Sequence, residues 1–394
     1  MLSTLIISST YLTAAEASRR LGVTRTTLYA YVSRGLLRSR ATSGSRKREY
    51  AAEDVEALLQ RRHARRDPTA VASAALGMHG LPVLDSSLTL IDGGRLYYRG
   101  QDAIALARES TLEHVATLLW DAELAGVGAS VVGPQQAKRL AEMPLIERFH
   151  TWLATEGAAD PTAFNLEPAA VRSVGLTILR GLSIVACGEL RSSDTIAATL
   201  VRGWSPRGKG ARRRIDAALV ASADHDLNVS AFTARCIASA GATPYMAITG
   251  ALAALSGHRH GGHTERVADM LDEPGSAREV IAARLRRGED VPGAGHPLYP
   301  DGDPRARLLL ELAVDGPAAQ RGHDFARALA ELLGRHPTLD LGLVVLARSL
   351  RLPRDAPLAL FALGRTVGWI AHILEQYATG VLIRPRARYV GTPP

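Results

Sequence analysis

The stretch VPGAGHPLYPDGDPR, residues 291–305, places a histidine in a glycine-rich turn and ends on an Asp-Pro-Arg sequence. Because glycine has no side chain, the backbone before His296 can approach a ligand closely and leave the imidazole uncovered. Pro304 restricts the backbone, which predicts that Arg305 is presented at a fixed place. A histidine can donate or accept a proton near neutral pH, and a fixed arginine can bind an anion, so the pair suits a site for a small anionic carbonyl compound. The alternative is a surface turn with a solvated histidine.

Three other stretches place polar groups beside apolar helical patterns. HPTLDLGLVVLARSL (336–350) has Asp340 at the head of a helix, where a carboxylate is either an N-cap or a partly desolvated general base. DHDLNVSAFTARCI (224–237) has His225 just before a helix, where it can meet an anion or simply precede the helix.

GRTVGWIAHILEQ (364–376) repeats Arg365, Trp369 and His372 at i, i+4 and i+7, and Arg384 follows near the C-terminus. Buried arginines need anionic partners, and several that converge imply a polycarboxylate.

The segment SGHRHGGHTERVADML, residues 256–271, carries His258, His260 and His263 in an H-x-H-x-x-H pattern. This spacing could ligate zinc, as in binuclear metal hydrolases, but those enzymes need a sheet-rich sandwich and an Asp where Gly262 stands. The favoured interpretation is that His260 lies in a turn that opens a helix. There the helix dipole keeps the imidazole neutral, so that it acts as a hydrogen-bond donor.

Composition indicates a largely helical protein, with 46% hydrophobic residues and 5% aromatic residues in 394. Two cysteines, Cys187 and Cys236, in apolar runs indicate buried thiols and a reducing compartment. The N-terminus lacks the pattern of a signal peptide, and we expect no apolar run long enough to span a bilayer. The predicted location is the cytoplasm, with no membrane partner.

Positive charge is concentrated in residues 1–67, which hold 13 Lys/Arg and six Asp/Glu, a net charge of +7 out of +8 for the chain. The pattern LTAAEASRRLGVTRTTLYAYVSRGLL predicts two short helices joined by a turn at Gly22, with Thr13 and Thr24 as caps. A basic wing and a third helix would follow. This module resembles the winged helix-turn-helix of MerR-type and excisionase-type DNA-binding domains; a basic adapter for protein contacts is the alternative.

The residues predicted to contact DNA lie on the second helix and in the wing. They are Arg25, Thr26, Tyr29, Arg46, Lys47 and Arg48.

Residues from about 80 to 394 resemble the citrate synthase family. Six separated strings carry the resemblance in the family's order: GRLYYRG, DHDLNVSAFTAR, HRHGGHTERV, GAGHPLYPDGDPR, PTLDLG, and GRTVGWIAHILEQ followed by IRPRARYVG. The resemblance implies a mainly α fold, an all-helical large domain and small domain that close over the substrates, and a homodimer. It also implies condensation of acetyl-CoA or propionyl-CoA with oxaloacetate, giving citrate or 2-methylcitrate and CoA. Acyl-CoA is then a substrate, and no cofactor or metal is expected.

Matched motif by motif, the resemblance assigns roles to ten residues. The catalytic residues would be His260, His296 and Asp340; the oxaloacetate ligands His225, Arg305, Arg365 and, from a partner subunit, Arg384; and the CoA-binding residues Gly293, Ala294 and Gly295.

The chain departs from the family's pattern at several positions. Pro297 and Pro300 stand where many bacterial relatives have basic residues, which puts the usual contacts to CoA phosphates in doubt. His263 and Thr264 replace a small residue and an asparagine, and Thr338 replaces an asparagine.

The expected organisation is a helix-turn-helix domain (1–67), a linker (68–78) and a catalytic region (79–394), with a small domain at roughly 258–358. The leading hypothesis is an acyl-CoA:oxaloacetate C-acyltransferase. The alternative is a DNA-binding transcriptional regulator that uses a citrate-synthase-like body as a metabolite sensor; a metal hydrolase ranks third.

Overall fold

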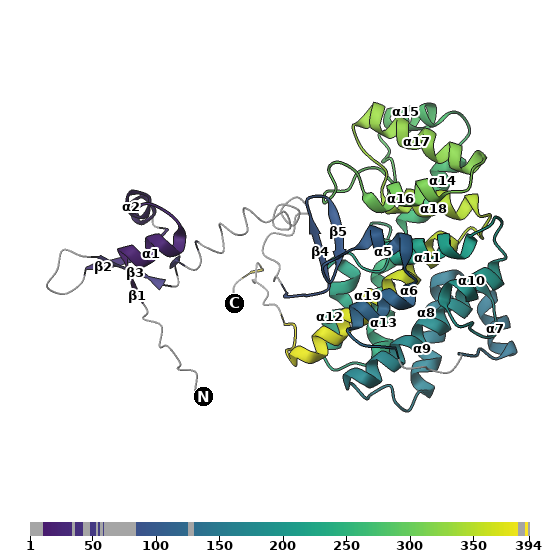
Figure 1. The fold of residues 1–394 in the computed structure, drawn as a ribbon, viewed down its shortest axis with the longest axis horizontal. Helices are drawn as coiled ribbons and strands as arrows, with labels where there is room; N and C mark the ends of the chain where they lie inside the picture. The colour runs from purple at the N-terminus through teal and green to yellow at the C-terminus, as the bar shows by residue number, and fades with distance from the viewer. Residues whose placement is uncertain are drawn as a thin grey trace. The chain divides into compact units, whose positions relative to one another are not determined.

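The computed structural model describes residues 11–33, 36–41, 48–52, 54–55, 58, 84–124, 130–384 and 391–392. The chain divides into two compact units, residues 1–81 and 82–394 (Figure 1). Each unit has its own hydrophobic core, so each is described by itself.

The first unit contains two helices and a small sheet, as the sequence predicts for a winged helix-turn-helix. Helix α1 (Ala14–Leu21) begins with a capping box between Thr13 and Glu16 and ends at Gly22 in the left-handed conformation. Helix α2 (Arg25–Ser33) follows, and the Thr24 hydroxyl accepts the N–H of Thr27.

The wing consists of β2 (Ser39–Ala41) and β3 (Arg48–Ala51), which pair antiparallel. A strand that the sequence did not predict, β1 (Tyr11–Thr13), pairs with β3 on its other side. Most of the predicted third helix lies outside the described residues.

The residues predicted to contact DNA are described only in part. Tyr29 is 54% exposed on α2, and Arg48 is exposed at the start of β3. Arg25 and Thr26 lie in the first turn of α2, but their side chains lie outside the described residues, as do Arg46 and Lys47 altogether.

The second unit opens with a three-stranded antiparallel sheet of β4 (Thr89–Asp92), β5 (Arg95–Tyr98) and β6 (Gln101–Asp102). Alternating residues around Leu88–Ile91 predict the first strand, and Asp92-Gly93-Gly94 predicts the turn that follows it. The other two strands were not predicted, and outside this small sheet the unit is helical, as the predicted mainly α fold requires. The first helix of the unit then begins at Ala103, where helical periodicity begins in the sequence.

The regular elements in the remainder of this unit are helices (Figure 1), and the connection from Arg286 to Pro304 carries the His296 turn. The helices are α5 (Ala103–Glu109), α6 (Leu112–Trp120), α7 (Pro134–Ala141), α8 (Leu145–Ala159), α9 (Pro168–Cys187), α10 (Ile196–Trp204), α11 (Ala211–Ala221), α12 (Val229–Ser239), α13 (Pro244–Leu255), α14 (His263–Asp272), α15 (Ala277–Arg286), α16 (Pro304–Leu312), α17 (Pro317–Leu333), α18 (Leu339–Ser349) and α19 (Ala356–Thr379).

Two of these helices correct the expectation that no apolar run is long enough to span a bilayer. Within the described residues, α9 and α19 pass that test by length and hydropathy. Their apolar windows are 67% and 94% buried inside the protein, so core packing accounts for their apolar character.

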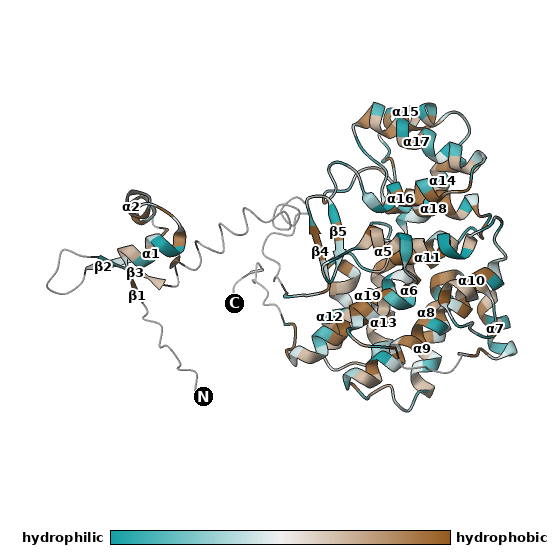
Figure 2. Cartoon of the chain, viewed as in Figure 1, coloured by the Kyte–Doolittle hydropathy of each residue, from teal (hydrophilic) through white to brown (hydrophobic). Residues whose placement is uncertain are grey.

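Two hydrophobic cores meet at α18. The larger core includes Leu339, Leu343 and Leu346, whereas the smaller one draws on residues 267–345 and includes Leu341 and Val344. The outlying helices of the smaller core, α15 and α17, alternate hydrophilic and hydrophobic residues, as helices packed on one side do (Figure 2). Because α18 has one face in each core, its first turn lies where the two cores join.

Candidate active site

Close packing of α11 against α19 forms the base of the site. A side chain at Gly364 would lie 2.3 Å from the carbonyl oxygen of Leu219, and one at Gly368 would lie 2.4 Å from that of Ala223. Glycine is therefore required at both positions, and it lets the end of α11 rest directly on α19. The Gly368 N–H donates to the Ala223 oxygen (3.1 Å), and Nε of Arg365 donates to the Ser222 oxygen (2.9 Å).

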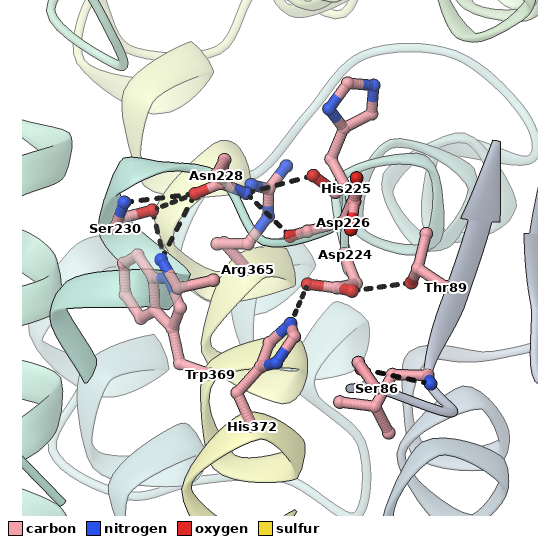
Figure 3. A network of polar contacts seen from close by, with 12 residues as sticks. Ser86, Thr89, Asp224, His225, Asp226, Asn228, Ser230, Arg365, Trp369 and His372 are labelled. Atoms are coloured by element: carbon pink, nitrogen blue, oxygen red, sulfur yellow. Dashed lines mark hydrogen bonds and ion pairs between the residues drawn. The ribbon is translucent and has the colours of Figure 1, made fainter. Parts of the chain in front are cut away.

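Asp224, just beyond α11, anchors the loop that follows (Figure 3). Its carboxylate is fully buried, accepts the hydroxyl of Thr89 (2.5 Å) and lies 3.4 Å from Nε2 of His372. Burial alone would raise the pKa of Asp224, but His372, Arg365 and Thr89 outweigh it and hold that pKa below its ordinary value. Asp224 is therefore ionised, and it fixes the residue after it.

That residue is His225, which is buried and directed away from the Asp224 network (Figure 3). Its Nε2 lies 2.9 Å from the hydroxyl of Tyr299, and its ring meets the ring of His296 edge-on at 5.1 Å. Burial, with further contributions from Arg305, His296, Arg365 and His260, holds the pKa of His225 well below its ordinary value. His225 is therefore neutral.

His260 lies in the turn before α14, and its Nε2 is 2.9 Å from the hydroxyl of Ser230 on α12. That hydroxyl also accepts the indole N–H of Trp369 (3.1 Å). The His260 and Phe361 rings pack in a T-shaped arrangement, with 5.8 Å between their centroids.

Burial and then Arg365 lower the pKa of His260 to about 3. Burial and the neighbouring guanidinium of Arg365 therefore favour the predicted neutral imidazole.

His296 sits in the turn that the sequence singled out. Its Nδ1 accepts the N–H of Leu298 (3.2 Å), which leaves the proton of the neutral ring on Nε2. Burial and then Arg305 lower the pKa of His296 to about 4. His296 is therefore a neutral ring with a directed N–H donor.

Arg305 is not presented by a stiff loop, as the sequence suggested. Pro304 is the first residue of α16, Asp303 is its N-cap, and the Arg305 side chain is buried. Nε and Nη2 of Arg305 donate to the two oxygens of Asp303 at 2.9 and 2.8 Å, and the Leu339 N–H also donates to Asp303 (3.1 Å). Asp303 therefore ties the guanidinium to the start of α18.

Asp340 is the second residue of α18 and does not cap it, since the N-cap position is Thr338. The Thr338 hydroxyl donates to Oδ2 of Asp340 (3.1 Å), whereas the buried Oδ1 has no hydrogen-bond partner among the described residues. Burial raises the pKa of Asp340 above its ordinary value, although His263, Thr338 and Arg305 oppose that shift. A buried carboxylate with an unpaired oxygen and a raised pKa is a candidate general base.

The Gly293–Gly295 segment joins the His296 turn to α18. Both glycines have positive φ (77° and 78°), and Ala294 forms an isolated antiparallel bridge with Pro337. The Thr338 N–H donates to the Gly293 oxygen (3.0 Å), and the Gly295 N–H donates to the His336 oxygen (2.8 Å). His296 and Asp340 are 44 positions apart in sequence, and these bonds fix the position of one relative to the other.

Among the groups predicted for the site, His225, His260, His296, Arg305 and Arg365 form one electrostatic cluster. Arg384 does not join it: it is exposed, and its neighbour Ile383 donates to the Ser239 hydroxyl at the far end of α12 from Ser230. At 1.5 Å per residue the two ends of that helix are about 14 Å apart.

Sequence reasoning missed Tyr299, which lies between His225, His296 and Arg305. Its only signal was an aromatic residue within the Gly/Pro-rich stretch. The H-x-H-x-x-H pattern does not act as one unit: His260 faces Ser230, His263 accepts the Gly293 N–H, and His258 is exposed. The described part of the chain shows no group of three or more His, Cys, Asp or Glu that could hold a metal ion.

Comparisons with known proteins bear on both units. A family model described as "Citrate synthase, C-terminal domain" matches residues 77–144 and 169–386, and one described as "Helix-turn-helix domain" matches residues 11–63. A citrate synthase of Haloferax volcanii is 31% identical over 362 residues, which cover 80% of this chain and 95% of that protein.

A 2-methylcitrate synthase of Corynebacterium glutamicum is also 31% identical, over 75% of this chain and 88% of its own length. A Mycobacterium tuberculosis relative is 42% identical over 216 residues, and that match spans only 57% of the relative.

Solved structures show the same fold. The citrate synthase of Thermotoga maritima has a TM-score of 0.66 at 27% identity and matches 80% of this chain and 95% of its own. The Thermoplasma acidophilum enzyme has a TM-score of 0.70 at 22% identity, covering 81% of this chain and 97% of its own, and supports the fold alone.

Proposed function

Since this chain belongs to the citrate synthase family, we propose that it condenses an acyl-CoA thioester with oxaloacetate and releases CoA. The observation that carries this proposal is the gathering of two buried guanidinium groups and three neutral imidazoles near a carboxylate, Asp340, whose buried Oδ1 has no hydrogen-bond partner among the described residues. Asp303 uses Nε and Nη2 of Arg305, which leaves Nη1, and Arg365 uses its Nε on a backbone oxygen. The remaining guanidinium nitrogens suit the carboxylates of a dianion such as oxaloacetate, which desolvation would otherwise exclude.

Asp340 is the proposed base. Its free Oδ1 would remove a proton from the methyl or methylene carbon next to the thioester carbonyl, a very weak acid. The raised pKa makes the carboxylate a stronger base than an exposed one, so proton removal is more favourable.

His260 is the proposed partner of Asp340 in this step. Nε2 faces the Ser230 hydroxyl (2.9 Å), which also lies 2.7 Å from Oδ1 of Asn228. In the proposed step this hydroxyl donates to Nε2, so that Nδ1 carries the proton and donates to the thioester oxygen. A neutral donor in a buried place stabilises the enolate as its charge develops.

His296 is the proposed acid of the condensation. Its Nε2–H would polarise the ketone of oxaloacetate and protonate the alkoxide as the new carbon–carbon bond forms. His225, Arg305 and Arg365 would bind the two carboxylates of oxaloacetate. Hydrolysis of the resulting thioester then gives the tricarboxylate and free CoA.

CoA is proposed to bind along the Gly293–Gly295 segment. The hydrogen bonds from this segment to residues 336–338 use the Gly293 oxygen and the Gly295 N–H. They do not use the N–H and carbonyl groups of Ala294, which could therefore bind a ligand.

The test is release of free CoA, followed with a thiol reagent, from acetyl-CoA or propionyl-CoA plus oxaloacetate. Comparison of kcat/KM for the two thioesters decides between citrate and 2-methylcitrate formation. A wild-type rate no higher than that of Asp340→Asn with both thioesters would refute the proposal.

A second copy of the chain is proposed to complete the site through Arg384. Val229 on α12 and Met246 on α13 are 55% and 53% exposed, which supports an apolar face available to another subunit.

Mixing Asp340→Asn and Arg384→Ala proteins tests this, because a heterodimer would contain one intact site. Recovery of about a quarter of wild-type activity is expected from random pairing, and no recovery would contradict the shared site.

DNA binding is the second candidate function. The helix-turn-helix match and the net charge of +7 on residues 1–67 favour it, and it is compatible with catalysis. Salt-dependent binding to labelled DNA fragments that shifts with oxaloacetate or CoA would support a metabolite-responsive regulator. Binding that persists unchanged after deletion of residues 1–67 would eliminate it. A cytoplasmic location remains a prediction.

A further inference from the structure

His263 has no part in the reaction proposed above, yet it touches the loop that carries His296. It is the first residue of α14, and its Nε2 accepts the N–H of Gly293 at 3.0 Å. An imidazole nitrogen that accepts a hydrogen bond is unprotonated, so the neutral ring carries its proton on Nδ1. A side chain, and not only backbone pairing, therefore fixes the start of this loop.

The same peptide group leads on to Asp340. The Gly293 oxygen accepts the N–H of Thr338 (3.0 Å), and the Thr338 hydroxyl donates to Oδ2 of Asp340 (3.1 Å). One series of contacts thus joins four residues, and each limits the movement of the next. They are His263, Gly293, Thr338 and Asp340.

The packing around Gly293 makes this series sensitive to small shifts. A side-chain carbon built on Gly293 would lie 3.0 Å from Cγ2 of Val267 on α14 and 3.3 Å from Cβ of Leu341 on α18. The loop is therefore held between two helices with little free space. Loss of the His263 bond would let it slide relative to both.

His263 is also close enough to affect the catalytic carboxylate electrostatically. Burial is the main influence on the pKa of Asp340 and raises it, and His263 is the leading influence in the opposite direction, ahead of Thr338 and Arg305. Only a protonated His263 lowers the pKa of Asp340 in this way. Because Nε2 accepts the Gly293 N–H, the ring is neutral, and the pKa of the carboxylate stays above its ordinary value.

We propose that His263 is a positioning residue that holds the Gly293 turn and Asp340 in register by accepting the Gly293 N–H as a neutral imidazole. This inference rests on the proposed reaction, in which Asp340 removes the proton and His296 acts on the ketone. It gives a use to the third histidine of the H-x-H-x-x-H pattern that needs no metal.

The experiment compares three single variants. His263→Leu removes the acceptor, and His263→Gln keeps one at a similar reach from the backbone. His258→Gln changes an exposed histidine of the same segment and serves as the matched control. Each is measured for kcat, for KM of oxaloacetate, for the isotope effect with methyl-deuterated acetyl-CoA, and for amide hydrogen exchange across residues 291–300.

His263→Leu is expected to lower kcat about 10- to 100-fold, because a shift of the order of an ångström at the reacting groups has that effect. It should leave KM for oxaloacetate nearly unchanged, raise the isotope effect and speed exchange of the Gly293 amide. His263→Gln should restore all three readouts most of the way, and the control should match wild type.

A wild-type kcat in His263→Leu, or equal losses in the Leu and Gln variants with unchanged exchange at Gly293, would overturn the inference. If wild-type protein released no CoA, the proposed reaction would fail separately. The exchange measurement would still decide the hydrogen bond, since Gly293 protection lost with Leu and regained with Gln supports it, and unchanged protection refutes it.

Discussion

Asp224, which is fully buried, and Asp340, whose Oδ1 is buried, differ in how their charge is compensated. Asp224 is paired with His372 and hydrogen-bonded to Thr89, and its pKa is held low. Asp340 has one hydroxyl partner, an unpaired oxygen and a raised pKa. The first is an anchor whose charge is compensated, whereas the second keeps a desolvated charge that chemistry can use.

The comparison implies different costs for the two carboxylates. Leaving Oδ1 of Asp340 unpaired in a buried place costs about 1–3 kcal/mol of folding free energy. Oδ1 of Asp224 likewise has no hydrogen bond among the described residues, but it lies 3.4 Å from Nε2 of His372, and this charge pairing offsets the burial of the carboxylate. We therefore expect Asp224 to matter mainly for stability and Asp340 mainly for activity.

The largest effect should come from Asp340→Asn. Loss of the base should lower kcat for CoA release about 10²- to 10⁴-fold, while the midpoint of thermal unfolding stays the same or rises. Steady-state kinetics and calorimetry measure the two effects, with Asp301→Asn, an exposed carboxylate of the same stretch, as the control. If Asp340→Asn lowered the unfolding midpoint and left kcat unchanged, Asp340 would be a structural residue like Asp224, and the contrast between the two would be wrong.

Asp224→Asn should show the reverse balance. It leaves His372 and Arg365 buried without their carboxylate, which should lower the free energy of unfolding by about 3–5 kcal/mol. Denaturant unfolding gives this quantity, and Asp92→Asn on the exposed edge of β4 is the matched control. An unchanged denaturation midpoint would show that Asp224 is not an anchor.

The dependence of stability on pH should sharpen the contrast. Asp224, with its folded pKa below 3.8, adds stability that is present above 3.8 and is lost as pH falls through the folded pKa. Asp340, with its folded pKa above 3.8, adds stability that is present below 3.8 and is lost as pH rises through the folded pKa.

Unfolding of each variant against wild type at a series of pH values measures these opposite trends. On raising the pH, the Asp224→Asn protein should become less stable relative to wild type, and the Asp340→Asn protein more stable. Parallel curves for the two variants would contradict the assigned pKa directions.

The smallest effect should come from Tyr299→Phe, which removes the hydroxyl beside Nε2 of His225 but keeps the ring. Loss of one hydrogen bond worth about 1 kcal/mol should raise KM for oxaloacetate about fivefold and leave kcat nearly unchanged. Substrate titration of the variant checks this. A large fall in kcat would assign Tyr299 a role in the chemistry itself.

Much of this site was accessible from local sequence. His260, His296 and Asp340 stand in short strings whose glycines and helix-start signals could be interpreted without coordinates. The roles given to them rest on resemblance, and they remain proposals. By contrast, the hydroxyl of Tyr299 and the acceptor role of His263 depend on contacts between segments 74 and 30 residues apart, which no local pattern encodes.

Periodicity and short-range steric rules were enough to predict helical segments, the cap at Thr13 and the strand before Asp92. The family of the larger unit was predicted from six short strings in the family's order. Tertiary structure alone decided that Arg305 is buried against Asp303, that Arg384 lies away from the cluster, and that one aspartate is compensated while the other is not. The reason is physical: desolvation and charge pairing depend on what surrounds a group in space, and chain neighbours do not specify those surroundings.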